Sequence, residues 1–237
     1  PWPVPDRPFS MWQTWNDLLF AHWPIDPDAL RPLMPRVLQP ETFDGQAWVA
    51  VVPFSMSGVR LRRCPAVAGT SSFPELNVRT YVNIDDKPGV YFFSLDAASR
   101  IAVETARRWF HLPYLTAQMQ THAEGETIKY SSTRTDGRGA PAELRGWFRP
   151  TGPVFRTQPG TIEYWLIDRY CLYTADDRGR ISRADILHDP WPLQVAEAEF
   201  ETQTMLASHG ITPIDQPPLL HFAKKLDVVA WSPRPIT

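Results

Sequence analysis

The stretch from Glu75 to Leu95, ELNVRTYVNIDDKPGVYFFSL, predicts a β-hairpin. Its first part, Glu75–Ile84, is rich in β-branched residues, and its apolar side chains alternate along the chain, which is typical of a strand with one buried face. The cluster Asp85–Gly89 contains the residue types that favour turns. The apolar run Val90–Leu95 then returns as the second strand, so a hairpin lies near the middle of the first half of the sequence.

Strand-like segments also precede this hairpin. Trp12–His22 mixes aromatic and apolar residues and is interpreted as a strand, and Asp26–Pro27 is typical of an N-cap followed by proline at the first position of a short helix. Ala47–Phe54 is rich in valine and predicts a buried strand that ends before Gly58. The following segment, Arg60–Ser72, is predicted to be a loop.

After the hairpin, Ser99 is placed to cap a helix from Arg100 to about Trp109. This helix should end before Leu112, because a residue that precedes proline avoids helical backbone angles. The remaining predicted elements are strands at Leu115–Ala123, Thr127–Thr135 and Ala142–Arg149, a helix at Thr161–Asp168, strands near Tyr170–Thr174 and Pro192–Phe200, a brief helix at Glu201–His209 and a last strand at His221–Trp231.

This pattern of many strands and a few short helices predicts an α+β fold that is mostly antiparallel β. Strands and helices do not alternate regularly, which argues against a doubly wound parallel sheet. The 25 prolines and 10 tryptophans also argue against a helical bundle. We therefore expect a curved sheet or closed β-barrel in a single domain over residues 1–237, with the proline- and glycine-rich stretch Arg149–Gly160 as the candidate boundary.

Composition narrows the classes of function. The net charge of −2 gives no general attraction to nucleic acid or to an anionic membrane. No apolar run approaches the ~18 residues of a membrane span, and PWPVPDRPF at the start does not resemble a signal peptide, so a cytoplasmic protein is expected. Cys64 and Cys171 form no disulfide framework, and no spacing of Cys and His indicates zinc. We expect no cofactor and no metal, and homo-oligomerisation stays open.

The segment Ala106–Ala117, ARRWFHLPYLTA, resembles the active-site segment of acetoacetate decarboxylases, which reads roughly G-R-E-x-Y-G-E-P-K-K-x-A. The positions in register with the Arg, Tyr, Pro and Ala of that segment are Arg107, Phe110, Pro113 and Ala117. The lysine that forms the Schiff base in those enzymes falls on Tyr114. Because a phenol cannot form an imine with a ketone, the resemblance implies either a different chemistry or none.

The chain as a whole resembles the YqjF-like family of the acetoacetate decarboxylase-like superfamily. The resemblance rests on WNDLLFAHWPID from Trp15, FDGQAWVAVVPF from Phe43, FPELNVRTYV from Phe73, the LPY step at Leu112 and HDPWPLQVAEAE from His188. It implies a cone-like β-barrel with a small interior pocket for an organic acid or a ketone. It also implies that Glu75, at the head of its strand, corresponds to a glutamate that lines the pocket of the decarboxylases.

Five residues are the candidates for this pocket. Glu75 and Tyr114 are the candidate catalytic groups, and Arg79, Arg107 and His188 are the candidate ligand-binding groups. Glu75 and Arg79 lie four apart on one strand and therefore share a face; inside a barrel they would need each other as charge partners. For each candidate an ordinary structural role stays open. Tyr114 could be a core residue, Arg107 could be favoured by the dipole at a helix C-terminus, and His188 could be a packing residue. The strand face that carries Glu75 and Arg79 could be exposed to solvent.

Two functions from different classes follow. The first is an enzyme that acts on a small organic acid or carbonyl compound without a Schiff base. Here Arg107 would hold a carboxylate, since guanidinium groups bind carboxylates in a bidentate fork. The second is a binding protein whose barrel holds a small molecule and performs no chemistry. Lys224 and Lys225 are predicted to be solvent-facing, so neither replaces the missing nucleophile.

Overall fold

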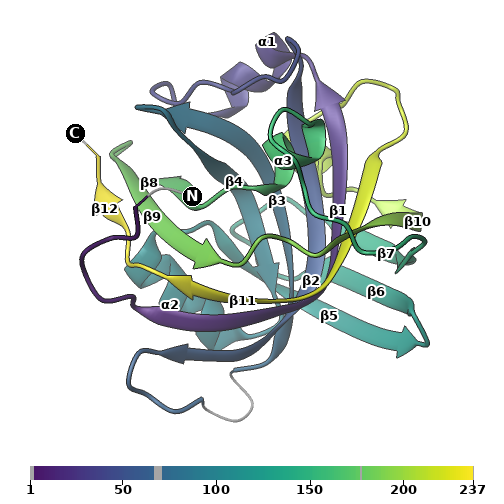
Figure 1. The fold of residues 1–237 in the computed structure, drawn as a ribbon, viewed down its shortest axis with the longest axis horizontal. Coiled ribbons are helices and arrows are strands. Elements are labelled where there is room, and N and C mark those ends of the chain that lie inside the picture. Colours follow the sequence, from purple (N-terminus) through teal and green to yellow (C-terminus); the bar gives the residue numbers. More distant parts are fainter. Residues whose placement is uncertain (1–2, 67–70, 177, 237) are drawn as a thin grey trace.

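The computed structural model describes residues 3–66, 71–176 and 178–236 (Figure 1). The strands are β1 (Met11–Ile25), β2 (Ala47–Leu61), β3 (Phe73–Ile84), β4 (Lys87–Ala97), β5 (Tyr114–Glu124), β6 (Thr127–Arg134), β7 (Glu143–Pro150), β8 (Cys171–Ala175), β9 (Ile181–His188), β10 (Leu193–Gln203), β11 (Leu219–Ala230) and β12 (Arg234–Pro235). The helices are α1 (Pro27–Leu30), α2 (Arg100–Phe110) and α3 (Ile162–Ile167), with short 3-10 turns η1 (Arg31–Leu33) and η2 (Ala207–His209).

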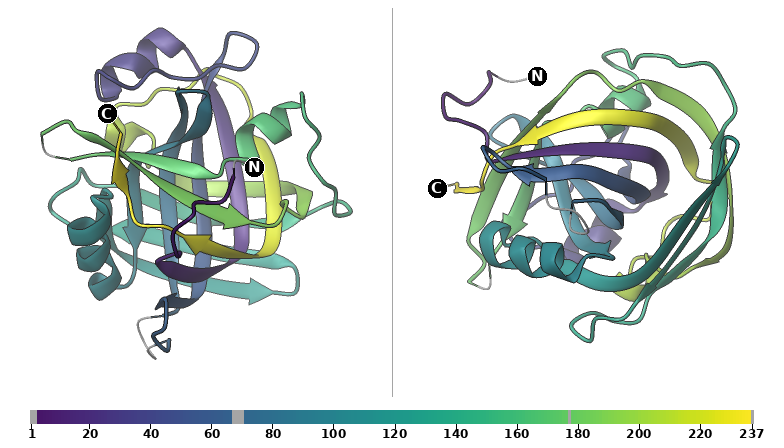
Figure 2. Two further views of the ribbon diagram at one scale, coloured as in Figure 1. Left: turned by 60° about the vertical axis from the view of Figure 1, so that its left-hand side comes forward. Right: turned by 90° about the horizontal axis from the view of Figure 1, so that it is seen from below.

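Nine strands pair in the order β4-β3-β2-β1-β11-β10-β7-β6-β5, and a parallel pairing of β4 with β5 closes them into a barrel. A second ring uses the same strands from β4 to β11 and closes through β9 and β8. The view from below in Figure 2 shows the strands curving around the interior. The prediction of an α+β, mostly antiparallel closed barrel with a few short helices is confirmed.

The strands shared by the two rings are buried on both faces. In β1, Leu19 and Ala21 enter one core cluster, whereas Leu18 and Phe20 enter another. The alternation follows from the two-residue period of a strand, which sends neighbouring side chains to opposite faces. The first cluster packs against β6 and β7, and the second packs against α2 and α3. The two faces of these shared strands therefore face two separate interior regions.

Several elements differ from the sequence prediction. β2 does not end before Gly58 but continues to Leu61, because Gly58 adopts a φ of +62° and forms a bulge opposite β1. β9 was not predicted, since its sequence ISRADILH mixes charged and apolar residues without clean alternation. The predicted helix at Glu201–His209 is mostly strand: β10 runs to Gln203, and only the 3-10 turn η2 remains before Gly210.

A buried ion pair links β4 to β6. The guanidinium of Arg134 donates to both carboxylate oxygens of Asp96 at 2.9 Å, and both side chains are at most 1% exposed. Arg134 also donates to the hydroxyl of Ser94 at 3.0 Å. Because the pair is bidentate and desolvated, it fixes the position of β6 relative to β4 near the point where β5 closes the barrel.

Candidate functional site

A cavity of about 460 Å³ lies in the ring that β8 and β9 close, on the face of the shared strands opposite β6, β7 and β10. Its wall is formed by β1 to β4, α2, the start of β5, the end of α3, and residues of β8, β9 and β11. Most of the wall is apolar. The phenylalanine, tryptophan and methionine side chains that line it are Met11, Trp15, Phe20, Phe54, Met56, Phe73, Phe92, Phe110, Trp191 and Trp231.

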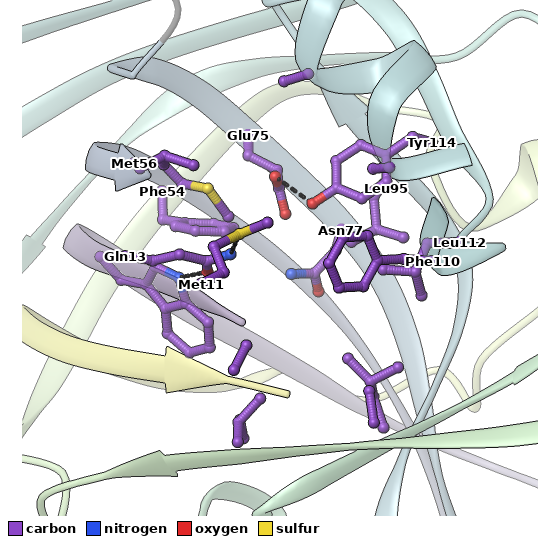
Figure 3. A pocket seen from close by; sticks show the side chains of 18 of the residues that line it. Met11, Gln13, Phe54, Met56, Glu75, Asn77, Leu95, Phe110, Leu112 and Tyr114 are labelled. Atoms are coloured by element: carbon purple, nitrogen blue, oxygen red, sulfur yellow. Dashed lines mark hydrogen bonds between the residues drawn. The ribbon is translucent and has the colours of Figure 1, made fainter. Parts of the chain in front are cut away.

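Three polar side chains of β3 enter this apolar space. Glu75, Asn77 and Arg79 occupy alternate positions of the strand and all line the cavity, as the period of a strand requires. They are 1%, 5% and 9% exposed, so each is essentially removed from bulk water. Figure 3 shows Glu75 and Asn77 directed into the cavity from the same strand. Because such groups are costly to bury without a partner, the polar stripe makes this cavity the candidate functional site.

Glu75 and Tyr114 form a pair at one end of the stripe. The phenol of Tyr114 donates a hydrogen bond of 2.8 Å to the Oε2 atom of Glu75 (Figure 3). Burial raises the pKa of Glu75 to about 8, although the bond from Tyr114 lowers it and the charge of Asp96 raises it further. Burial, and then the carboxylate of Glu75, raise the pKa of Tyr114 well above its ordinary value. Near neutral pH, Glu75 therefore holds a proton that it can give or take back.

The end of α2 and the Leu-Pro step that follows it position Tyr114. The helix ends at Phe110, and His111 adopts a left-handed conformation with a φ of +51°. The chain then enters β5, where Tyr114 lies opposite Leu95 in the parallel pairing that closes the barrel. Arg107 donates from Nη1 to the backbone carbonyl of Tyr114 at 2.9 Å. The phenol is thus held by strand pairing and by a hydrogen bond from the helix.

The opposite end of the stripe is cationic, and we call Arg79 and Arg169 the arginine end of the cavity. The guanidinium of Arg79 lies 5.4 Å from the ring centre of Phe20 and 5.8 Å from that of Tyr81. Arg169 lies over Tyr81 at 5.1 Å and forms an ion pair with Glu41. Within the described residues, Arg79 forms no ion pair with a carboxylate, and its Nε atom has no hydrogen-bond partner.

His22 lies near these arginines and is not an imidazolium. The Nε2 atom of His22 lies 2.7 Å from the hydroxyl of Tyr81. Burial, followed by the charge of Arg79, lowers the pKa of His22 well below its ordinary value. His22 is therefore neutral at physiological pH and adds no charge to the arginine end.

The structure brings three of the five candidates together in the cavity, namely Glu75, Arg79 and Tyr114. The expected contact between Glu75 and Arg79 is absent among the described ion pairs, because Glu75 turns toward Tyr114 whereas Arg79 turns toward Phe20 and Tyr81. The described lining residues do not include Arg107, whose guanidinium is engaged by the backbone of Tyr114. The expectation that Arg107 reaches into the cavity is therefore corrected.

His188 is also not among the described residues that line the cavity. Its ring stacks on Tyr170 with 4.6 Å between ring centres, and its Nδ1 atom lies 2.8 Å from the carbonyl oxygen of Asp189. Trp191, three residues further along the same loop, lines the cavity instead. Within the segment HDPWP, the side chain that reaches the cavity is therefore the tryptophan and not the predicted histidine.

Arg169 is a lining residue that the sequence did not single out. It lies two residues after the end of α3, and its Nε atom donates to the carbonyl of Trp165 at 2.6 Å. One arginine among 20 carries no distinguishing signal when its partner Glu41 lies 128 positions away in the chain. The four lysines of the sequence, at 87, 129, 224 and 225, all belong to the described residues, and none lines the cavity.

Two further features concern the whole described chain. None of its helices is long and apolar enough to cross a membrane. Across residues 3–66, 71–176 and 178–236 there is no group of three or more His, Cys, Asp and Glu side chains placed to hold a metal ion.

The closed barrel has the fold seen in solved acetoacetate decarboxylase-like enzymes, and the likeness to them is one of fold. The acetoacetate decarboxylase-like enzyme from Sphingomonas wittichii RW1 superposes with a TM-score of 0.65 at 11% identity, covering 98% of this chain and 94% of that chain. The enduracididine biosynthesis enzyme MppR in complex with pyruvate gives 0.64 at 11% identity, covering 99% and 93%. The acetoacetate decarboxylase of Legionella pneumophila gives 0.60 at 12% identity, covering 100% and 92%.

The chain belongs to the DUF2071 family of uncharacterised conserved proteins, which it matches over residues 12–227. It is 47% identical over 228 residues to the uncharacterised protein YqjF of Bacillus subtilis (strain 168), with 96% of this chain and 93% of that protein covered. The YqjF-like family and the acetoacetate decarboxylase-like fold that the sequence indicated are thereby confirmed.

Proposed function

We propose that the cavity binds a small organic acid or carbonyl compound and that Glu75 and Tyr114 transfer protons to and from it without a Schiff base. The observation that carries this proposal is the hydrogen-bonded pair of Glu75 and Tyr114 in the cavity wall. The pKa of Glu75, raised by burial to about 8, lies close to the pH at which a general acid or base works best. Arg79 would attract the carboxylate of an acid.

The pair supports one reaction class in particular. In its ionised form Glu75 would take a proton from the carbon next to a carbonyl group, and the electron pair of that C–H bond would move toward the carbonyl oxygen. The hydroxyl of Tyr114 would then donate a hydrogen bond to the resulting enolate oxygen. Return of the proton from Glu75 restores the carbonyl compound, so the minimal activity is reversible enolisation.

The test measures exchange of deuterium from solvent into methyl ketones and keto acids by NMR. We expect the protein to accelerate this exchange and Glu75→Gln to slow it by about 100-fold or more, the usual contribution of a general base. Tyr114→Phe should slow it less. Exchange at the uncatalysed rate with every compound, or an undiminished rate in Glu75→Gln, would refute the assignment of proton transfer to this pair.

A second candidate function is binding without chemistry. It is favoured by the tyrosine at the position of the Schiff-base lysine and by the largely apolar wall. Mass spectrometry of small molecules that co-purify with the native protein separates the two functions. A defined compound that is retained unchanged after incubation would favour binding, whereas its conversion would favour catalysis.

A further inference from the structure

We infer that the ligand has two polar groups separated by an apolar body, with a carboxylate at the arginine end of the cavity and a carbonyl group at Glu75 and Tyr114. This inference rests on the proposed function and deepens it by naming the class of acid. Such a ligand differs from the keto acids in which the carboxylate and the carbonyl are adjacent. The reason is that the groups that would bind them, the arginine end on one side and Glu75 with Tyr114 on the other, lie at opposite ends of the polar stripe.

The first argument is distance. Glu75 and Arg79 are four residues apart on β3, so their Cα atoms are separated by roughly 13 Å at the usual rise of a strand. Their side chains also engage different groups: Arg79 contacts Tyr81, which lies beyond it on the strand, and Glu75 contacts Tyr114 of β5. A keto acid of three or four carbons is too short to contact both groups at once.

The second argument is charge. The arginine end contains two guanidinium groups, and Glu41, which pairs with Arg169, is its one described carboxylate partner. Glu75 does not offset the remaining charge, because burial raises its pKa to about 8 and leaves it protonated near neutral pH. A buried charge without a partner is costly. One carboxylate of a ligand would neutralise the excess charge of Arg79.

The third argument is unsatisfied hydrogen bonding along the stripe. Within the described residues, the Nε atom of Arg79, the Nη2 atom of Arg169 and the Oδ1 atom of Asn77 are buried and have no hydrogen-bond partner. Native proteins leave few buried polar atoms unpaired, so a group of them around one cavity points to a missing partner. Two of the three are donors at the arginine end, which matches an anionic acceptor.

The fourth argument is the space between the two ends. A volume of about 460 Å³ is within the usual range for drug-sized ligands. Phe20, Val52, Phe54 and Phe92 line the wall. An apolar chain or ring would displace water from these surfaces, whereas a short polar acid would leave most of them wet.

The experiment uses methyl-ketone acids of increasing length, from 4-oxopentanoate to 10-oxoundecanoate, and measures their binding to the full chain by calorimetry. We expect affinity to rise at least tenfold from the shortest acid to the best one. The methyl ester of the best acid should bind at least tenfold more weakly than the acid. Arg79→Gln should abolish this preference, Arg79→Lys should keep part of it, and the exposed control Arg145→Gln should behave as the unmodified protein.

The other end of the ligand is tested with a pair of acids of equal length. Glu75→Gln should weaken binding of 7-oxooctanoate but leave octanoate unchanged, since octanoate has no carbonyl group at that end. Equal affinity for all chain lengths, or an acid-over-ester preference that survives Arg79→Gln, would overturn the inference. The proposed function would still stand if short keto acids exchanged deuterium. If no ketone exchanges while long acids still bind through Arg79, the proposed function fails and the assignment of the arginine end stands.

Discussion

Glu75 is the residue whose ionisation should be visible in the stability of the protein. Its pKa is raised by burial to about 8 in the folded state, against an ordinary value of about 4.3. The folded state therefore holds this proton over a pH range in which the unfolded chain has lost it. The contribution of this bound proton to the free energy of unfolding is therefore complete below about pH 4.3 and is lost as the pH rises toward 8.

We predict that the free energy of unfolding of Glu75→Gln, relative to the unmodified protein, increases as the pH rises from about 5 to about 8. The reason is that the amide cannot ionise and so escapes the cost of a buried carboxylate. The difference should grow by at most about 1.4 kcal/mol per pH unit. Urea unfolding at several pH values measures it, and a difference that stays constant over this window would show that Glu75 keeps an ordinary pKa.

Tyr114 yields a chemical prediction. Borohydride in the presence of acetoacetate should leave the intact mass of the protein unchanged, because a phenol forms no imine and no lysine lines the cavity. Lys224 instead contacts Asp17 at 2.6 Å and is largely exposed. A stable adduct on any lysine would show that the nucleophile has been misplaced.

At the scale of residues, resemblance and strand period singled out three side chains that line the cavity, namely Glu75, Arg79 and Tyr114. Glu75 and Tyr114 come from segments 39 positions apart and meet in a hydrogen bond. The period of a strand predicted that Arg79 shares the face of Glu75, but not that the two side chains diverge. Sequence did not reveal that Arg107 is engaged by a backbone carbonyl, because that contact depends on the geometry of a helix end.

At the scale of elements, alternation identified most strands but failed where both faces are buried or where charges intervene. β9 escaped prediction because Arg183 and Asp185, which lie two apart, form an ion pair on a half-buried strand. β2 was cut short because Gly58 was interpreted as a stop, whereas a glycine with positive φ also fits a bulge within a strand.

The link between β4 and β6 gives a prediction at this scale. Arg134→Met should lower the free energy of unfolding by about 3–5 kcal/mol, because it leaves the carboxylate of Asp96 buried without its partner. The double variant Asp96→Leu with Arg134→Met should be more stable than Arg134→Met alone, since neither charge remains. Urea unfolding measures both, with Arg145→Gln as the exposed control. A loss below about 1 kcal/mol would contradict the role of the pair.

At the scale of the whole molecule, the five strands β4, β3, β2, β1 and β11 belong to both rings. Each ring needs these strands to close, and their two faces are buried by different neighbours. Removing either set of neighbours would expose one complete face of the shared strands. The cavity wall and the opposite core are therefore coupled through the same backbone.

We predict that the protein unfolds as one cooperative unit, with no stable half that ends in Arg149–Gly160. A cut there separates β1 to β7 from β10 and β11, yet β1 pairs with β11 over eleven positions and β7 pairs with β10. Neither fragment could close a ring, so each would expose buried apolar surface. Urea transitions followed by tryptophan fluorescence and by far-UV circular dichroism should coincide. Limited proteolysis that released a folded fragment ending in this stretch, or two separate transitions, would show that the rings fold independently despite the strands they share.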